Sequence, residues 1–328
     1  MNSSNLVQQR ERYAISDSAF EWSRRVYNIV EKLLSVRVNF HYAEGTLEAG
    51  DIFLFNHFAR FETFLPQYLL YKHIGTKARA VASAEFFEED DTLGRYLRSV
   101  GVVPNNLPGL LPFLAAEIIQ GRKVVLFPEG GMVKDRRVVD SDGEHSVYSR
   151  TAGERRKHHS GAAVLALVLD AFKSQVLRVA QASSSAQLRR WSEELGFNHV
   201  DELVFAASRP THIVTANITF YPIRVDDNFL RKGVELFVRG RLTRRAAEEL
   251  LVEGNILLRE TDMDIRLGQP ILPSDYWSDS ERKLMGRIAR RFHKLEDFFD
   301  ASKGSERWRE KVLASRVRFR VLEVRDEY

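Results

Sequence analysis

The four apolar residues Ile52-Phe53-Leu54-Phe55 are followed directly by Asn56-His57-Phe58-Ala59-Arg60-Phe61-Glu62. A short apolar run of this kind predicts a buried strand, and the polar residues then emerge at its carboxyl end. Ligands of α/β sheets bind outside the carboxyl ends of the strands. We therefore look for a functional site at this turn.

His57 and Glu62 form the candidate catalytic pair of this segment. Across a strand-to-helix turn, Glu62 can accept a hydrogen bond from one ring nitrogen of His57. The other nitrogen is then held as an acceptor, which a general base needs. On the spacing alone, a turn histidine in a local salt link is an equal alternative.

The chain on both sides alternates predicted strands and helices. The predicted strands are residues 36–42, 52–55, 78–83, 101–103, 123–127, 212–223 and 265–271. The predicted helices are residues 20–34, 64–73, 86–100, 110–120, 160–173, 181–196, 229–252 and 278–300, the last opened by a capping box that starts at Ser278. This order predicts an α/β fold with a mixed central sheet flanked by helices, in which the strand at 36–42 pairs with the strand that begins at Asp51.

The composition excludes several kinds of site. The chain has 328 residues, which suffice for one large domain or two modest ones, and its formal net charge of +4 fits anionic partners without requiring them. Since there is no cysteine, disulfides, thiolate nucleophiles and zinc–thiolate sites are excluded. No secretory signal and no apolar run of roughly 20 residues is visible, so membrane contact is expected to be peripheral.

Other motifs are missing. There is no serine-hydrolase elbow and no P-loop, and the histidines lack metal-ligand spacing, so we expect no metal. Aromatic residues do not interleave with basic ones on a predicted strand, and we expect no nucleic-acid partner. Residues 132–159 are polar without periodicity and predict a long loop, with a flap over the site as one use.

Four blocks, in order along the chain, carry a family resemblance. They are Asn56-His57-x4-Glu62, Gly101-Val102-Val103, Phe127-Pro128-Glu129-Gly130-Gly131 and Phe220-Tyr221-Pro222-Ile223. Together they resemble the pattern of the glycerolipid acyltransferases, the superfamily of lysophosphatidate and glycerol-3-phosphate acyltransferases. The resemblance covers roughly residues 36–225, and the segment that begins at Gly268 is similar to the family's closing strand.

The resemblance implies an O-acyltransferase that needs no cofactor and takes acyl-CoA or acyl carrier protein as its acyl donor. His57 would be the general base on a hydroxyl of a lysophospholipid or glycerol phosphate, and Glu62 would orient it. For Glu129, bracing its turn is an equal alternative to holding the acceptor. The substrate-binding residues implied near these two are Asn56, Arg60, Glu129, Gly130 and Gly131.

Two departures from the family pattern concern the acceptor. Family members usually have Asp at the position of Glu62, although lipid A acyltransferases resemble this chain in having Glu. The second block usually ends in an arginine that binds the acceptor's phosphate, and this chain has Pro104-Asn105-Asn106 there. The side chains that could replace that arginine, unless they belong to a solvated loop, are Lys134, Arg136 and Arg137.

We therefore predict an amphipathic helix in residues 1–35, a glycerolipid acyltransferase-like domain in residues 36–275 and a helical carboxyl-terminal extension in residues 276–328. The enzyme would be a peripheral protein of the cytoplasmic membrane face, with an anionic membrane surface as a partner. The alternatives are a non-catalytic module of the same fold that binds lipid or acyl carrier protein, and a thioesterase that uses the same base on water. The acyl length, the donor, the head group and the oligomeric state stay open.

Overall fold

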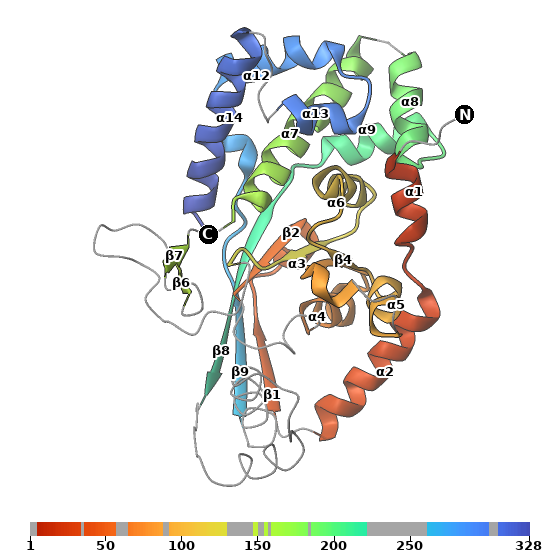
Figure 1. Cartoon of the computed structure of the whole chain (residues 1–328), viewed down its shortest axis with the longest axis vertical. Coiled ribbons are helices and arrows are strands. Elements are labelled where there is room, and N and C mark those ends of the chain that lie inside the picture. Colours follow the sequence, from red (N-terminus) through yellow and green to blue (C-terminus); the bar gives the residue numbers. More distant parts are fainter. Residues whose placement is uncertain are drawn as a thin grey trace.

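Most of the described strands form one large mixed sheet (Figure 1). The computed structural model describes residues 5–33, 36–56, 65–87, 92–129, 147–149, 154–156, 159–182, 185–221, 261–301 and 308–328. Among these residues the seven strands of the sheet are β1 (Val36–His41), β2 (Ile52–Phe55), β3 (Arg79–Ala82), β4 (Val102–Pro104), β5 (Val124–Leu126), β8 (Ile213–Tyr221) and β9 (Thr261–Leu267). A separate antiparallel pair consists of β6 (Val147–Ser149) and β7 (Glu154–Arg156).

The order of the strands across the sheet is β1-β9-β8-β2-β5-β3-β4. The strands from β8 to β4 run parallel to one another, β9 is antiparallel to β8, and β1 is parallel to β9. Strand β2 is central, and its Leu54 lies opposite Leu126 of β5 on one side and Thr215 of β8 on the other. The predicted α/β fold with a mixed central sheet flanked by helices is confirmed.

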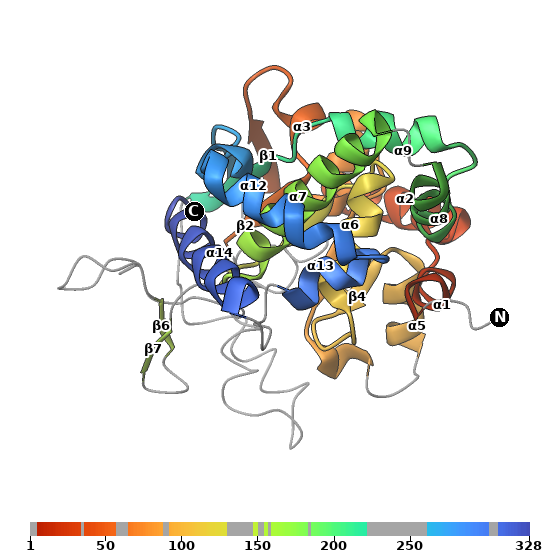
Figure 2. The same ribbon diagram turned by 90° about the horizontal axis from the view of Figure 1, so that it is seen from above.

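Helices cover both faces of this sheet (Figures 1 and 2). The described helices are α1 (Asn5–Arg12), α2 (Asp17–Leu33), α3 (Thr46–Ala49), α4 (Leu65–Ile74), α5 (Thr92–Ser99), α6 (Leu110–Ile119), α7 (Gly161–Gln181), α8 (Ser185–Leu195), α9 (Val200–Ser208), α12 (Asp279–Ile288), α13 (Leu295–Ala301) and α14 (Trp308–Asp326). Short 3₁₀ helices are η2 (Ala84–Phe87), η3 (Pro273–Tyr276) and η4 (Ala289–Arg291). None of the described helices is long and apolar enough to cross a bilayer.

The side chains of β2 alternate between two hydrophobic cores. Ile52 and Leu54 belong to the core formed with α6, α7 and the carboxyl-terminal helices, whereas Phe53 and Phe55 belong to the core formed with α2, α4 and α5. All four residues are buried. The strand is apolar throughout because a parallel strand with helices on both faces has no side exposed to water.

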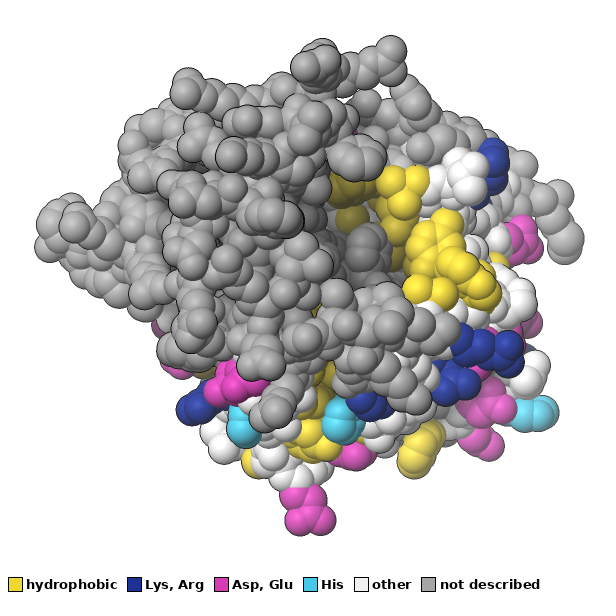
Figure 3. Space-filling view, turned by 90° about the horizontal axis from the view of Figure 1, so that it is seen from below, with side chains coloured by type: hydrophobic (Ala, Val, Ile, Leu, Met, Phe, Trp, Pro, Cys, Tyr) yellow, Lys and Arg dark blue, Asp and Glu magenta, His cyan; other side chains and the backbone are white. Residues whose placement is uncertain are grey.

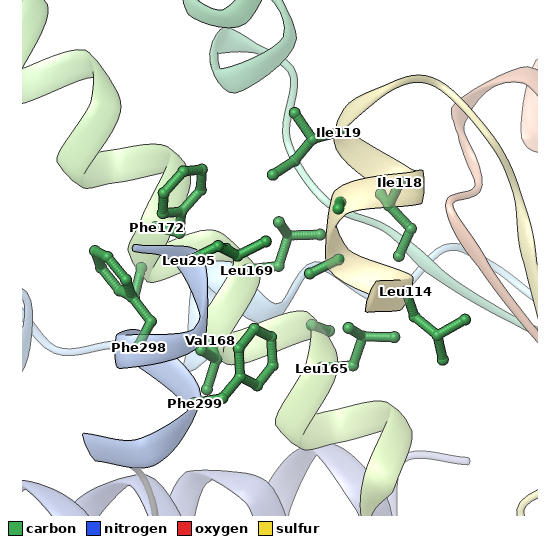
Figure 4. Close-up of a cluster of buried hydrophobic side chains, with 14 of the residues drawn as sticks. Leu114, Ile118, Ile119, Leu165, Val168, Leu169, Phe172, Leu295, Phe298 and Phe299 are labelled. Carbon is green, nitrogen blue, oxygen red and sulfur yellow. The ribbon is translucent and has the colours of Figure 1, made fainter. Parts of the chain in front are cut away.

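The larger core is centred on α7. Its side chains Leu165, Leu169 and Phe172 face α6 and α13 (Figure 4). The rings of Phe172 and Phe298 meet edge to face, with their centroids 5.2 Å apart. Burial on every side of α7 explains why this helix is apolar around most of its circumference.

One predicted strand pairing is wrong. The strand at residues 36–42 was expected to pair with the strand at Asp51, but β1 pairs with β9, from Val36 opposite Thr261 to His41 opposite Arg266. The partners of β2 are β5 and β8. The short helix α3 lies between β1 and β2 in sequence, so the connection is not a hairpin.

Several predicted helices have different limits, and the helix predicted at 160–173 continues to Gln181 as α7. In the range 86–100, the described part consists of η2, which ends at Phe87, and α5, which begins only at Thr92. In the range 278–300, the capping box between Ser278 and Glu281 is confirmed, but α12 ends at Ile288 and the chain continues through η4 into α13. The break turns the apolar side chains of α13 back onto α7.

Two further predicted segments lie wholly or partly outside the described residues. In the range 132–159, predicted as a loop, β6 and β7 are strands, and the other residues up to 158 lie outside the described part. The basic helix predicted at 229–252 also lies outside it. Strand β4 includes Pro104, which was expected to end it. Helices α3 and α9 were not predicted, and the described part of the range 1–35, predicted as one amphipathic helix, contains the two helices α1 and α2.

Candidate active site

The candidate site is the carboxyl edge of the parallel strands. Asn56 follows β2 and Phe127 follows β5, and these strands are neighbours in the same register. In the strand order, β3 lies on one side of β2, and β8, which comes later in the sequence, lies on the other side. A reversal of this kind leaves a crevice outside the carboxyl ends, where α/β proteins bind ligands.

Asn56 is held by the backbone of β8. Its side-chain Nδ2 donates to the carbonyl oxygen of Ile218 at 3.0 Å, and its Oδ1 accepts from the Ile218 amide at 2.6 Å. Strand β8 extends beyond the end of β2, so the asparagine side chain continues the contact where the backbone pairing ends. The geometry gives Asn56 a structural role, and its contact with a substrate stays a prediction.

The third block begins beside the first. The rings of Phe55 and Phe127 lie 6.4 Å apart between centroids, which joins the ends of β2 and β5. The carbonyl oxygen of Pro128 accepts a hydrogen bond from the His159 amide at 2.7 Å. Glu129 follows and is partly buried. The loop after β5 is therefore fastened to the segment that opens α7.

The second block has structural explanations. Gly101 has a φ of +91°, and a Cβ atom there would lie 3.0 Å from the carbonyl oxygen of Ala78. Both the conformation and the space require glycine. The backbone N–H of Asn105 donates to the carbonyl oxygen of Ala82 at 2.9 Å. The side-chain Oδ1 of Asn105 accepts from the backbone N–H of Ala84 at 3.1 Å. Where the family pattern has an arginine, this asparagine braces the turn after β3.

Most of the predicted site residues lie outside the described part of the chain. These are His57, Arg60, Glu62, Gly130, Gly131, Lys134, Arg136 and Arg137. Asn56 and Glu129 are described, and they stand at the ends of neighbouring strands. In the described ranges, no group of three His, Asp or Glu side chains could hold a metal ion.

Buried charged groups gather at the opposite, amino edge of the sheet. Asp51 directly precedes β2, and its Oδ2 accepts from the His212 amide at 3.0 Å. Lys123, directly before β5, donates through Nζ to the Glu48 carbonyl oxygen at 2.7 Å. Burial lowers the pKa of Lys123 and that of His212. This cluster was not predicted, although a polar residue directly before each buried strand is a usable signal.

A second buried cluster surrounds Glu117 of α6. Its carboxylate accepts from Arg79 Nε at 2.6 Å and from Arg10 Nε at 3.4 Å, and Arg122 Nε lies 2.9 Å away. Arg79 and Glu117 are each 2% exposed. Burial lowers the pKa of Arg79, and the carboxylate opposes that effect. Arg79 begins β3, so this cluster also lies away from the carboxyl edge and ties α1 to the sheet.

Comparisons with known proteins add one distant likeness. No family model matches the sequence, and no curated protein sequence matches it. Among solved structures, the 1-acyl-sn-glycerophosphate (LPA) acyltransferase PlsC from Thermotoga maritima is similar, with 13% identity and a TM-score of 0.33 over 86% of this chain and 84% of that one. A likeness at this level carries no argument about activity, which has to come from the residues themselves.

Proposed function

We propose that the protein is an acyltransferase that moves a fatty acyl chain from acyl-CoA or acyl carrier protein to a hydroxyl of a lysophospholipid or glycerol phosphate. The observation that carries the proposal is the ordered set of four blocks, with the first and third at adjacent strand ends. Blocks that are 71 residues apart between Asn56 and Phe127 meet at one edge of the sheet. That edge is the one where α/β proteins carry out chemistry.

The reaction needs a base and no covalent enzyme intermediate. His57 takes the proton of the acceptor hydroxyl while its oxygen attacks the thioester carbonyl. The carbon–sulfur bond then breaks, and the proton on the imidazolium passes to the leaving thiolate. Glu62 orients the ring and stabilises the imidazolium. A base of this kind contributes about 10²- to 10⁴-fold to the rate, and positioning supplies much of the rest.

The acceptor would be held by the loop after β5. Glu129 would contact it or brace the loop, and the amides of Gly130 and Gly131 can approach it closely because no side chain intervenes. Asn56 and Arg60 are the other residues that we propose to hold the acceptor. The phosphate of the acceptor would pair with Lys134, Arg136 or Arg137, because Asn105 occupies the usual arginine position and is engaged in a turn.

An anionic membrane surface would supply the lipid. Trp22 on α2 is 59% exposed and Leu93 on α5 is 47% exposed, although both are large apolar side chains. The Trp22 ring lies edge-on to Tyr96 of α5 at 6.0 Å, so the two helices are neighbours. Seen from the carboxyl edge, the described surface has hydrophobic side chains gathered beside lysines and arginines (Figure 3). Apolar and basic groups together suit an anionic bilayer.

The proposal is tested by the release of free CoA from palmitoyl-CoA by the purified protein, with and without lysophosphatidate. The wild type and His57→Ala are compared, with His199→Ala as a matched control. His199 is exposed and makes no side-chain capping bond at α9. We expect acceptor-dependent release in the wild type and in His199→Ala, and its reduction by about 10²-fold or more in His57→Ala.

Other outcomes separate the alternatives. Free fatty acid released equally with and without an acceptor would favour a thioesterase. Binding to phosphatidylglycerol vesicles without consumption of either palmitoyl-CoA or palmitoyl-acyl carrier protein, across a set of lysophospholipids and glycerol phosphate, would favour a binding module. Equal acceptor-dependent rates in wild type and His57→Ala would refute His57 as the base.

A further inference from the structure

The amino terminus of α7 lacks a side-chain cap of its own. Ser160 occupies the capping position, and its hydroxyl makes no capping hydrogen bond. The first amides of a helix have no partners within the helix and need other acceptors. The start of α7 bears on the candidate site because the backbone amide of His159, just before this helix, donates to the carbonyl oxygen of Pro128 in the loop after β5.

A tyrosine 169 residues further along the sequence than His159 meets this helix start. The phenol of Tyr328, which follows α14, donates to the carbonyl oxygen of His159 at 3.2 Å. The phenol therefore holds His159, which lies just before the start of the helix. A tyrosine phenol is protonated at neutral pH and can donate, and burial raises the pKa of Tyr328 further from neutrality.

The end of α14 that carries Tyr328 is itself anchored. Arg320 Nε, on the same helix, pairs with the carboxylate of Glu281 of α12 at 3.3 Å. The rings of Tyr276 and Tyr328 both pack against the larger core. Tyr328 is therefore fixed by its surroundings and can hold His159 in turn.

We propose that Tyr328 is a positioning residue of the acyl-transfer site, acting through His159 on the loop of Pro128 and Glu129. The inference rests on the proposed function, because it takes this loop to hold the acceptor. The connection consists of two successive hydrogen bonds, from Tyr328 to the carbonyl group of His159 and from the amide of His159 to Pro128. Removing the first bond loosens the residue that donates the second.

The test compares Tyr328→Phe with Tyr276→Phe. Each variant removes one phenol oxygen and keeps a ring packed against the same core, but only Tyr328 contacts His159. Hydrogen exchange of the His159 amide is measured first, since it reports the bond to Pro128 directly. We expect this amide to exchange about three- to tenfold faster in Tyr328→Phe than in the wild type, and to be unchanged in Tyr276→Phe.

The kinetic part of the test uses palmitoyl-CoA and lysophosphatidate. We expect Tyr328→Phe to raise the KM for the acceptor about three- to tenfold while the KM for the thioester stays within twofold. Equal effects of both variants would show general anchoring of α14 and overturn the proposal, as would an unchanged exchange rate at His159. A wild type without turnover would refute the acyltransferase proposal, and the exchange rates alone would then decide whether Tyr328 holds the loop.

Discussion

The side chain of Asn56 forms two hydrogen bonds with the backbone of Ile218, one donated at 3.0 Å and one accepted at 2.6 Å. A primary amide presents a donor and an acceptor side by side, as a backbone peptide group does. Asn56 therefore pairs with β8 as one more strand residue would, beyond the end of β2. The residue next to the predicted base is thus fixed to the sheet.

Replacing Asn56 by alanine should destabilise the fold. Ile218 is 2% exposed, and its amide and carbonyl would lose their partner in a place that water reaches poorly. We expect Asn56→Ala to lower the free energy of unfolding by about 1–3 kcal/mol. Urea denaturation measures it, with Asn39→Ala as the control because Asn39 bonds to Asp264 on the exposed surface. A loss no larger than that of Asn39→Ala would contradict the structural role of Asn56.

Gly101→Ala should also destabilise the protein. The new methyl group would lie 3.0 Å from both Ala78 O and Ile15 Cδ1, at a φ of +91°. We expect a loss of about 1–3 kcal/mol in the free energy of unfolding. The matched control is Gly161→Ala at the start of α7, where no atom lies within 4 Å of the added Cβ. If both substitutions have the same effect, the backbone at Gly101 is not restrictive.

Because Glu117 lies in a buried ion cluster, we expect its substitution to lower the free energy of unfolding strongly. Neutralising it by Glu117→Gln would leave Arg79, which is 2% exposed, without a charge partner. Breaking a buried pair in this way costs about 3–5 kcal/mol. Thermal and urea denaturation would measure the loss. Asp17→Asn serves as the control, because the carboxylate of Asp17 is 84% exposed and its pair with Lys77 should matter little.

The elements of the sheet could largely be predicted because their signals are local. Ile52 to Phe55 forms the expected strand, and its two-sided burial accounts for four apolar residues in a row. The pairing of β1 with β9 could not be predicted in the same way, since more than 200 residues separate Val36 from its partner Thr261. The sequence of neither strand specifies its partner, and the pairing is determined by the packing of the whole sheet.

The helical carboxyl-terminal extension predicted for residues 276–328 is confirmed, since α12, α13 and α14 are its described helices. Val317, Phe319 and Val321 alternate with charged residues as strand residues do, yet they lie in α14. Phe319 is 58% exposed, whereas Val317, Val321 and Val324 are buried. The buried residues follow the spacing of a helix face, and the alternation is not accompanied by alternating burial.

The candidate site could be placed at the carboxyl edge from sequence because the polar residues directly follow apolar runs. The meeting of Asn56 with the loop at Phe127 follows from the pairing of β2 with β5. The contact of Tyr328 with His159 could not be predicted, since it depends on how α14 packs against α7. The catalytic assignments of His57 and Glu62 stay predictions.

Stability should depend on pH through Glu194 of α8. The pKa of Glu194 is raised to about 7, mainly by burial and also by the nearby carboxylates of Glu296 and Asp297, whereas Lys294 and Arg190 act to lower it. Between the ordinary value of 4.5 and about 7, the folded protein therefore holds a proton that the unfolded chain has released. The free energy of unfolding falls as pH rises through this window, and the loss is complete above it.

Glu194→Gln removes this penalty because its side chain is neutral at every pH. The pKa shift of Glu194 corresponds to several kcal/mol at most, and the partial exposure of this side chain reduces that effect. We therefore expect the free energy of unfolding of the variant to exceed that of the wild type by on the order of 1–2 kcal/mol at pH 8. At pH 4.5 the two proteins should be nearly equal. Urea denaturation at both pH values measures this, with Glu193→Gln, at an exposed neighbouring position, as the control. The same difference at both pH values would mean that packing, and not the titration of Glu194, separates the variant from the wild type.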